Sequence, residues 1–157
     1  LYYALADGSS IVCAAYGLTK PNGVGLSPDG STVYVAETSV GRVWKWSISS
    51  PGVVERGTTP LAHGTLLYGF NGYQLLDSLA VDGDGNVCVA TLVTGAISVI
   101  NPEGELLDQV HVPKWDAYVT NICFGGPDLM TAYVTSSGWG LLYEMPWERP
   151  GLRLNYQ

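Results

Sequence analysis

The chain has 157 residues, of which 46% are hydrophobic and 13% charged, and it contains 20 glycines. This composition favours strands and turns and excludes a helical bundle. The net charge of −7, with only 7 basic residues, excludes a basic surface able to neutralise nucleic-acid phosphates. No apolar run is long enough to cross a membrane. We therefore predict an all-β protein whose partners are neither nucleic acids nor membranes.

One sequence pattern recurs along the chain: a predicted strand, a Gly/Asp turn and a second predicted strand. Its copies cover 21–36 and 76–90, and a looser third copy covers 120–135. A repeat spaced by roughly 40–55 residues is typical of a β-propeller, in which each blade buries its faces only against its neighbours. The repeat therefore predicts a partial propeller made of four-stranded blades.

In chain order, apolar alternation and turn residues predict about fourteen strands. They make a blade remnant at 1–17 and blades at about 18–58, 75–113 and 118–157. Three and a half blades leave two blade faces exposed, which predicts either a partner or an unstable protein. The expected strands cover 1–6, 11–16, 22–27, 33–38, 41–48, 53–57, 78–81, 87–92, 96–100, 106–112, 120–124, 131–136 and 140–145, with candidate short strands at 66–70 and 152–154.

The cysteines do not form a metal-binding pattern. Cys13, Cys88 and Cys123 lie in apolar, strand-like runs, and no CxxC spacing is present. We expect three buried free thiols, which points to a reducing compartment and hence to the cytoplasm.

Two other sequence features indicate neither a calcium loop nor a covalent catalytic site. Residues 82–86, Asp-Gly-Asp-Gly-Asn, resemble the start of a calcium loop, but its twelfth position is Val93 and not an acidic residue. We predict a hairpin turn there. His63 and His111 are far apart and no nucleophile elbow is present, so covalent catalysis is not expected.

The candidate site comes from equivalent positions in the repeats. Asn22, Asp77 and Thr120 each stand just before the first strand of their copy, and equivalent positions of adjacent blades converge on the channel axis. The amide oxygen of Asn22 and the carboxylate of Asp77 are suitable ligands for a hard cation such as calcium. From spacing alone, caps that bond the turn backbone explain these two residues equally well.

Aromatic residues lie in the loops that feed the same end. Tyr73, Trp115 and Tyr118 could wall a pocket there or pack between blades. Glu37 follows the second strand of its blade and is a further candidate for ligand contact. In contrast, Trp44, Trp46 and Trp139 are assigned to the blade cores.

The motifs resemble the C-terminal half of the gluconolactonase family, also called the senescence marker protein or regucalcin family. The resemblance covers nearly the whole chain and rests on segments 17–30, 34–38, 77–82, 85–90, 123–129 and 133–136. It implies part of a six-bladed propeller that binds one divalent cation, most often calcium, with zinc or magnesium as alternatives. It also implies hydrolysis of sugar lactones or related cyclic esters.

The resemblance assigns roles to individual residues. It implies that Asn22 is a metal ligand and that Asp77 is both a metal ligand and the proposed general base. The family's Pro-Asp-Gly reads Leu-Asp-Ser here, with the carboxylate kept. The family's glutamate ligand would precede Leu1. Tyr73, Trp115, Tyr118, Thr120 and Glu37 are the candidate contacts to a small-molecule lactone.

Two functional hypotheses follow from these patterns. The first is a metal-dependent lactone hydrolase whose ring is completed by an upstream segment, by another chain or by a second copy in a homodimer. The alternative is a non-catalytic, truncated propeller that acts as a binding or assembly module.

Overall fold

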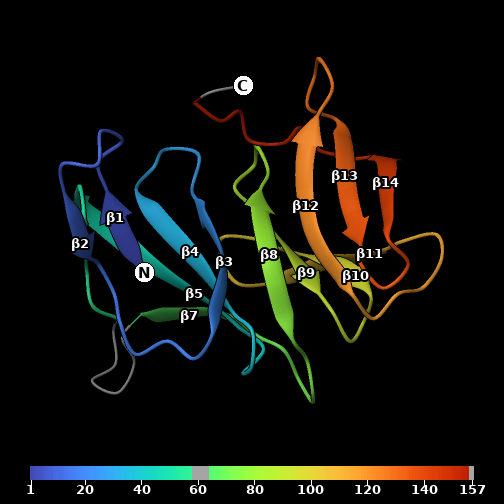
Figure 1. Cartoon of the computed structure of the whole chain (residues 1–157), viewed down its shortest axis with the longest axis horizontal. Coiled ribbons are helices and arrows are strands. Elements are labelled where there is room, and N and C mark those ends of the chain that lie inside the picture. Colours follow the sequence, from blue (N-terminus) through green and yellow to red (C-terminus); the bar gives the residue numbers. More distant parts are fainter. Residues whose placement is uncertain (58–63, 156–157) are drawn as a thin grey trace.

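The computed structural model describes residues 1–57 and 64–155, which form fourteen β-strands in four antiparallel sheets (Figure 1). The predicted all-β class is confirmed. These described residues contain no helix, and so none that could span a membrane. The first sheet contains β1 (Tyr2–Ala4) and β2 (Ile11–Cys13), and the second contains β3 (Pro21–Leu26), β4 (Thr32–Glu37), β5 (Arg42–Ser50), β6 (Val53–Val54) and β7 (Thr65–Gly69). The third contains β8 (Leu76–Val81), β9 (Val87–Thr91), β10 (Ala96–Ile100) and β11 (Leu106–His111), and the fourth contains β12 (Val119–Gly125), β13 (Thr131–Ser136) and β14 (Leu141–Pro146).

The turns between paired strands use the residues that the repeat supplies. Between β3 and β4, Asp29 accepts hydrogen bonds from the Ser27 hydroxyl at 2.6 Å and the Ser31 backbone N–H at 3.0 Å. Gly30 there has φ of +70°, a conformation that a residue with a side chain rarely adopts. The local sequence thus fixes the hairpin and, through it, the register of the two strands.

Of the two candidate short strands, one is confirmed and the other is wrong. The candidate strand at 66–70 exists as β7, which pairs with the first half of β5, whereas β6 pairs with its second half. At nine residues, β5 is long enough to take both partners on one edge. The candidate strand at 152–154 does not form. Instead, Gly151 makes an isolated bridge to Asp82 at the end of β8.

The sheets stack side by side, and β8 lies between β3 and β12 (Figure 1). β9 and β10 are buried on both faces, because the third sheet packs against the second on one side and the fourth on the other. Val87 and Val89 join the core shared with the second sheet, while Cys88 and Ala90 join the core shared with the fourth. This is the packing of propeller blades around inner strands.

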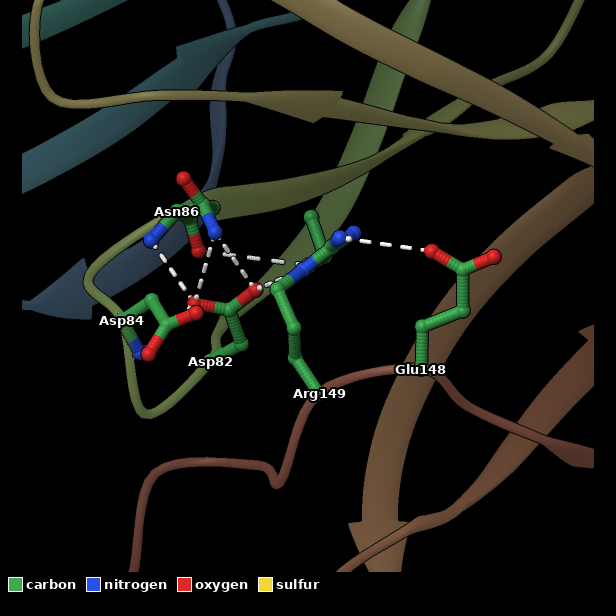
Figure 2. A network of polar contacts seen from close by, with 6 residues as sticks. Asp82, Asp84, Asn86, Glu148 and Arg149 are labelled. Atoms are coloured by element: carbon green, nitrogen blue, oxygen red, sulfur yellow. Dashed lines mark hydrogen bonds and ion pairs between the residues drawn. The ribbon is translucent and has the colours of Figure 1, made fainter.

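The C-terminal segment returns to the third sheet and is fixed there by Asp82 (Figure 2). The Asp82 carboxylate is fully buried and accepts hydrogen bonds from the Asn86 backbone N–H at 2.9 Å and the Asp84 backbone N–H at 3.1 Å. Arg149 donates from Nε to the same carboxylate at 3.1 Å. The predicted hairpin turn at 82–86 is therefore present, and its buried carboxylate is engaged by the protein itself.

The expectation of three buried thiols is wrong for two of them. Cys88 is buried, whereas Cys13 and Cys123 are exposed, and all three are free. Cys13 belongs to a two-stranded sheet, and Cys123 lies on β12 in the wall of an apolar groove that Val24, Leu79 and Leu152 also line. All three cysteines lie in apolar runs, but only Cys88 is buried, because, of the three sheets that carry them, only the third has neighbouring sheets on both faces.

The outer face of β3 is apolar and open. Val24 is 55% exposed and Leu26 is 48% exposed. They line a cavity of about 620 Å³ between the first and second sheets, to which Leu1, Tyr3 and Val53 also contribute.

Candidate functional site

The three residues that the repeat singled out occupy matching positions in space. Asn22, Asp77 and Thr120 are each the second residue of β3, β8 and β12, which are the adjacent inner strands of their sheets. Each lies where the pairing register shifts: between Pro21 and Val24, between Leu76 and Leu79, and between Val119 and Asn121. Such a bulge turns a side chain away from the regular alternation of the strand.

The backbones of β3 and β8 approach closely beside these bulges. A Cβ atom at Gly23 would lie 2.6 Å from the backbone N of Leu79 and 2.8 Å from the carbonyl oxygen of Asp77. Only glycine allows this contact. It places Asn22 and Asp77 next to each other at the same end of neighbouring inner strands.

The side chains of Asn22 and Asp77 form no hydrogen bond or ion pair with any other residue that the structure describes. Asn22 is exposed and Asp77 is half-buried. The alternative that they cap turns through backbone hydrogen bonds is therefore unsupported, and both groups keep their oxygen lone pairs for a ligand. Across the described ranges, however, no three His, Cys, Asp or Glu side chains gather as a metal-binding group.

The chain enters β3 through a strained residue. Lys20 has φ of +53°, in the left-handed region, although it is not glycine and precedes Pro21. That region is disfavoured before proline. The Lys20 carbonyl is held by the Thr38 backbone N–H at 3.0 Å. Strain of this kind concentrates at functional sites, and Lys20 lies two residues before Asn22.

Glu37 lies inside the second sheet, with 5% of its surface exposed. One carboxylate oxygen accepts a short hydrogen bond from the Thr19 backbone N–H, and the other accepts one from the Trp44 indole N–H at 2.7 Å. Both oxygens therefore serve to hold the loop before β3 against β4 and β5. Its suggested contact with a ligand stays a prediction.

The three aromatic residues expected near this end are exposed: Tyr73 by 76%, Trp115 by 63% and Tyr118 by 58%. The Trp115 indole N–H donates to the carbonyl of Thr94 at 3.2 Å. The assignment of Trp139 to the blade core is wrong, because this residue lies in the turn between β13 and β14 and is 52% exposed.

The side chain of Trp139 is nevertheless held in place. Its indole N–H donates to the Trp115 carbonyl at 3.0 Å, and the Lys114 ammonium lies 3.2 Å from the centroid of its ring. The exposed ring of Trp139 is thus held against Trp115 and Lys114.

Two buried polar residues, which sequence reasoning missed, fasten the loops. Gln74 donates to the Thr94 hydroxyl at 2.6 Å and accepts from the Val93 backbone N–H at 3.0 Å. Asp116 accepts from the Gly138 backbone N–H at 3.0 Å and from the Ser136 hydroxyl. Each joins the loop before an inner strand to the next hairpin of its sheet. Their shared position, a few residues before the bulge, was the available signal.

The Asp116 carboxylate stays charged despite its burial. Burial acts to raise its pKa, but the hydrogen bonds from Ser136 and from the backbone N–H of Tyr118 and Gly138 outweigh this, so the pKa lies below its ordinary value. A charged group held by several donors is a rigid anchor for the turn that carries Ser137 and Trp139.

Comparison with known proteins identifies the family. The profile of the SMP-30/gluconolactonase/LRE-like region matches residues 1–138. The chain belongs to this family. Lactonase drp35 of Staphylococcus saprophyticus is 32% identical over 116 residues, which are 74% of this chain but 35% of that protein. Lactonase drp35 of Staphylococcus aureus is 28% identical over the same length.

Solved structures of gluconolactonase-like proteins have the same fold. A putative gluconolactonase has a TM-score of 0.77 at 24% identity, covering 98% of this chain and 47% of that one. The calcium-binding protein regucalcin from Agrobacterium tumefaciens has a TM-score of 0.77 at 22% identity, with coverage of 98% and 55%. This chain thus spans about a third of the curated relatives and about half of these solved proteins. Membership of the SMP-30/gluconolactonase family accounts for the blade-like sheets.

Proposed function

We propose that this chain supplies part of the active site of a lactone hydrolase, in which Asn22 and Asp77 bind a divalent cation. The observation that carries the proposal is the pair of unengaged oxygen groups at matching bulges of adjacent inner strands. Their donor chemistry, one amide oxygen and one carboxylate, fits a hard cation, with calcium preferred to zinc or magnesium. The names of the relatives, lactonases and a calcium-binding regucalcin, agree with this reading.

Each of the four residues Asn22, Asp77, Trp115 and Tyr118 would have its own role in hydrolysis. Asn22 and Asp77 would hold a divalent cation at the ends of β3 and β8. When bound there, the cation would polarise the lactone carbonyl and stabilise negative charge on its oxygen. Asp77 would also take a proton from the attacking water, although a carboxylate next to a cation is a weak base. The exposed rings of Trp115 and Tyr118 would border the lactone.

The site needs further oxygen ligands beyond these two side chains. Calcium takes about six to eight oxygens, so water and other parts of a propeller ring must supply the rest. The apolar outer face of β3, with Val24 and Leu26 exposed, gives a surface on which further blades could pack. We propose that the ring is completed by a complementing chain or by a second copy, and native mass spectrometry would distinguish these states.

The proposal is tested by calcium-dependent lactone hydrolysis and thermal stabilisation of the purified protein. We expect calcium to raise the melting temperature and to support hydrolysis, and we expect Asp77→Ala to remove both effects. An unchanged calcium response in Asp77→Ala would refute the assignment of the cation site.

A second candidate is a non-catalytic binding module. It is favoured by one observation, namely that Asp77 is the one acidic side chain on these three inner strands, in a structure whose described residues contain no cluster of acidic or metal-binding side chains. Calcium binding without hydrolysis of any lactone would support this module instead.

A further inference from the structure

Three hydroxyl groups form a continuous chain at the end of the fourth sheet. The Thr120 hydroxyl oxygen lies 2.9 Å from that of Thr135 and 2.6 Å from that of Ser137. Thr120 is the bulged residue of β12 and matches Asn22 and Asp77 in strand position. Thr120 and Thr135 are half-buried, whereas Ser137 is exposed. This row of hydroxyls therefore leads from the interior of the sheet to the surface at the candidate site.

Counting the hydroxyl hydrogens shows that this row of three hydroxyls has one free donor. Each hydroxyl has one hydrogen and two lone pairs, and the two bonds use two of the three hydrogens. When Thr135 donates to Thr120 and Thr120 donates to Ser137, the Ser137 hydrogen is free to bind an acceptor. When both bonds reverse, Ser137 donates inward and its lone pairs can accept from a ligand. Linked hydroxyls also polarise one another, which strengthens the terminal group.

The turn that presents Ser137 is held on both sides. Asp116 binds the neighbouring Ser136 hydroxyl and the Gly138 backbone N–H. Beyond them, the indole of Trp139 is tied to the carbonyl of Trp115. A hydroxyl on such a turn loses little further freedom when it binds a ligand, and this favours recognition.

We propose that Ser137 contacts the substrate and recognises a hydroxyl group carried by the lactone ring, with Thr120 and Thr135 as positioning residues. This inference rests on the proposed function, because it places the lactone at the ends of the inner strands. A hydroxyl substituent is both a donor and an acceptor, and Ser137 can complement it in either direction. Rings that carry hydroxyls would then bind more tightly than bare rings.

The experiment measures binding of two lactams, which resist hydrolysis, by NMR titration in the presence of calcium. D-glucono-δ-lactam carries ring hydroxyls, and 2-piperidone has the same six-membered ring without them. We expect Ser137→Ala to weaken binding of the hydroxylated lactam by roughly 2- to 10-fold, the effect of one neutral hydrogen bond, and to leave 2-piperidone unchanged. Ser137→Thr should restore binding, and the control Thr131→Val, at the other end of β13, should match the wild type.

The opposite results would overturn the inference. They are unchanged binding of the hydroxylated lactam by Ser137→Ala, equal weakening of both lactams, or a wild type that binds the two lactams alike. Hydrolysis by the wild type and by Asp77→Asn tests the proposed function separately. A wild type that discriminates through Ser137 but hydrolyses no lactone refutes the hydrolase and keeps the recognition site.

Discussion

Replacing Arg149 with methionine removes the positive charge beside the buried Asp82 carboxylate while keeping much of the side-chain volume (Figure 2). Arg149 Nε lies 3.1 Å from Asp82, which is fully buried, and Arg149 itself is 23% exposed. Breaking a buried ion pair by removing one partner costs about 3–5 kcal/mol. Asp82 keeps its bonds from Asn86 and Asp84, and Arg149 is partly solvated, so we expect about 2–3 kcal/mol for Arg149→Met.

Urea unfolding followed by tryptophan fluorescence measures this loss directly. With an m-value of about 2 kcal/mol/M, the midpoint should fall by roughly 1–1.5 M. The control is Glu148→Gln, because Glu148 is 84% exposed and its contact with Arg149 spans 3.5 Å. That surface pair should contribute less than about 0.5 kcal/mol. Equal small losses in both variants would show that the C-terminal segment does not depend on the buried pair.

Three further predictions concern the anchors of the site and the thiols. Because the folded-state pKa of Asp116 is lowered, its contribution to stability is present above its ordinary pKa and is lost as pH falls through the lowered value; urea midpoints of Asp116→Asn should therefore vary less with acid pH than those of the wild type, and parallel curves would contradict this. Gly23→Ala should lower the free energy of unfolding by more than about 2 kcal/mol, since its Cβ would meet the backbone of β8. Gly30→Ala, at φ of +70° with no atom within 4 Å, should lower it by only about 1 kcal/mol. Similar melting temperatures for the two variants would refute the close approach. Cys13 and Cys123 should react with a thiol reagent in the folded protein, while Cys88, whose pKa is raised by burial, should react only after unfolding; one or three fast thiols would contradict the structure.

The sequence predicted the strands well because their residues alternate and their turns contain Gly, Asp and Pro. It identified Asn22, Asp77 and Thr120 from repeat position alone, and the structure places them at matching bulges. It missed Gln74 and Asp116, because lone polar residues in loops stand out only through their shared position a few residues before the bulge, and burial cannot be read from that position. The sequence analysis assigns Trp139 to a core, whereas the four-residue turn 137–140 between β13 and β14 holds it at the surface.

Pairing between distant segments was also beyond the sequence. The contact of Arg149 with Asp82 joins residues 67 positions apart, and no local pattern links them. No local pattern shows that β5 pairs with β7 through its first half and with β6 through its second half. Both features are set by tertiary packing. Tertiary packing also overrides the local strand preference of 152–154, which does not form a strand.

The measurement that tests the central claim most directly is calcium-dependent lactone hydrolysis by the wild type, Asp77→Asn and Asp84→Asn. Asp84 is the matched control, because it is also acidic but lies in the turn at the other end of β8. We predict that calcium supports hydrolysis in the wild type and in Asp84→Asn and fails to do so in Asp77→Asn. Hydrolysis that persists in Asp77→Asn with the same calcium dependence would contradict the proposed site.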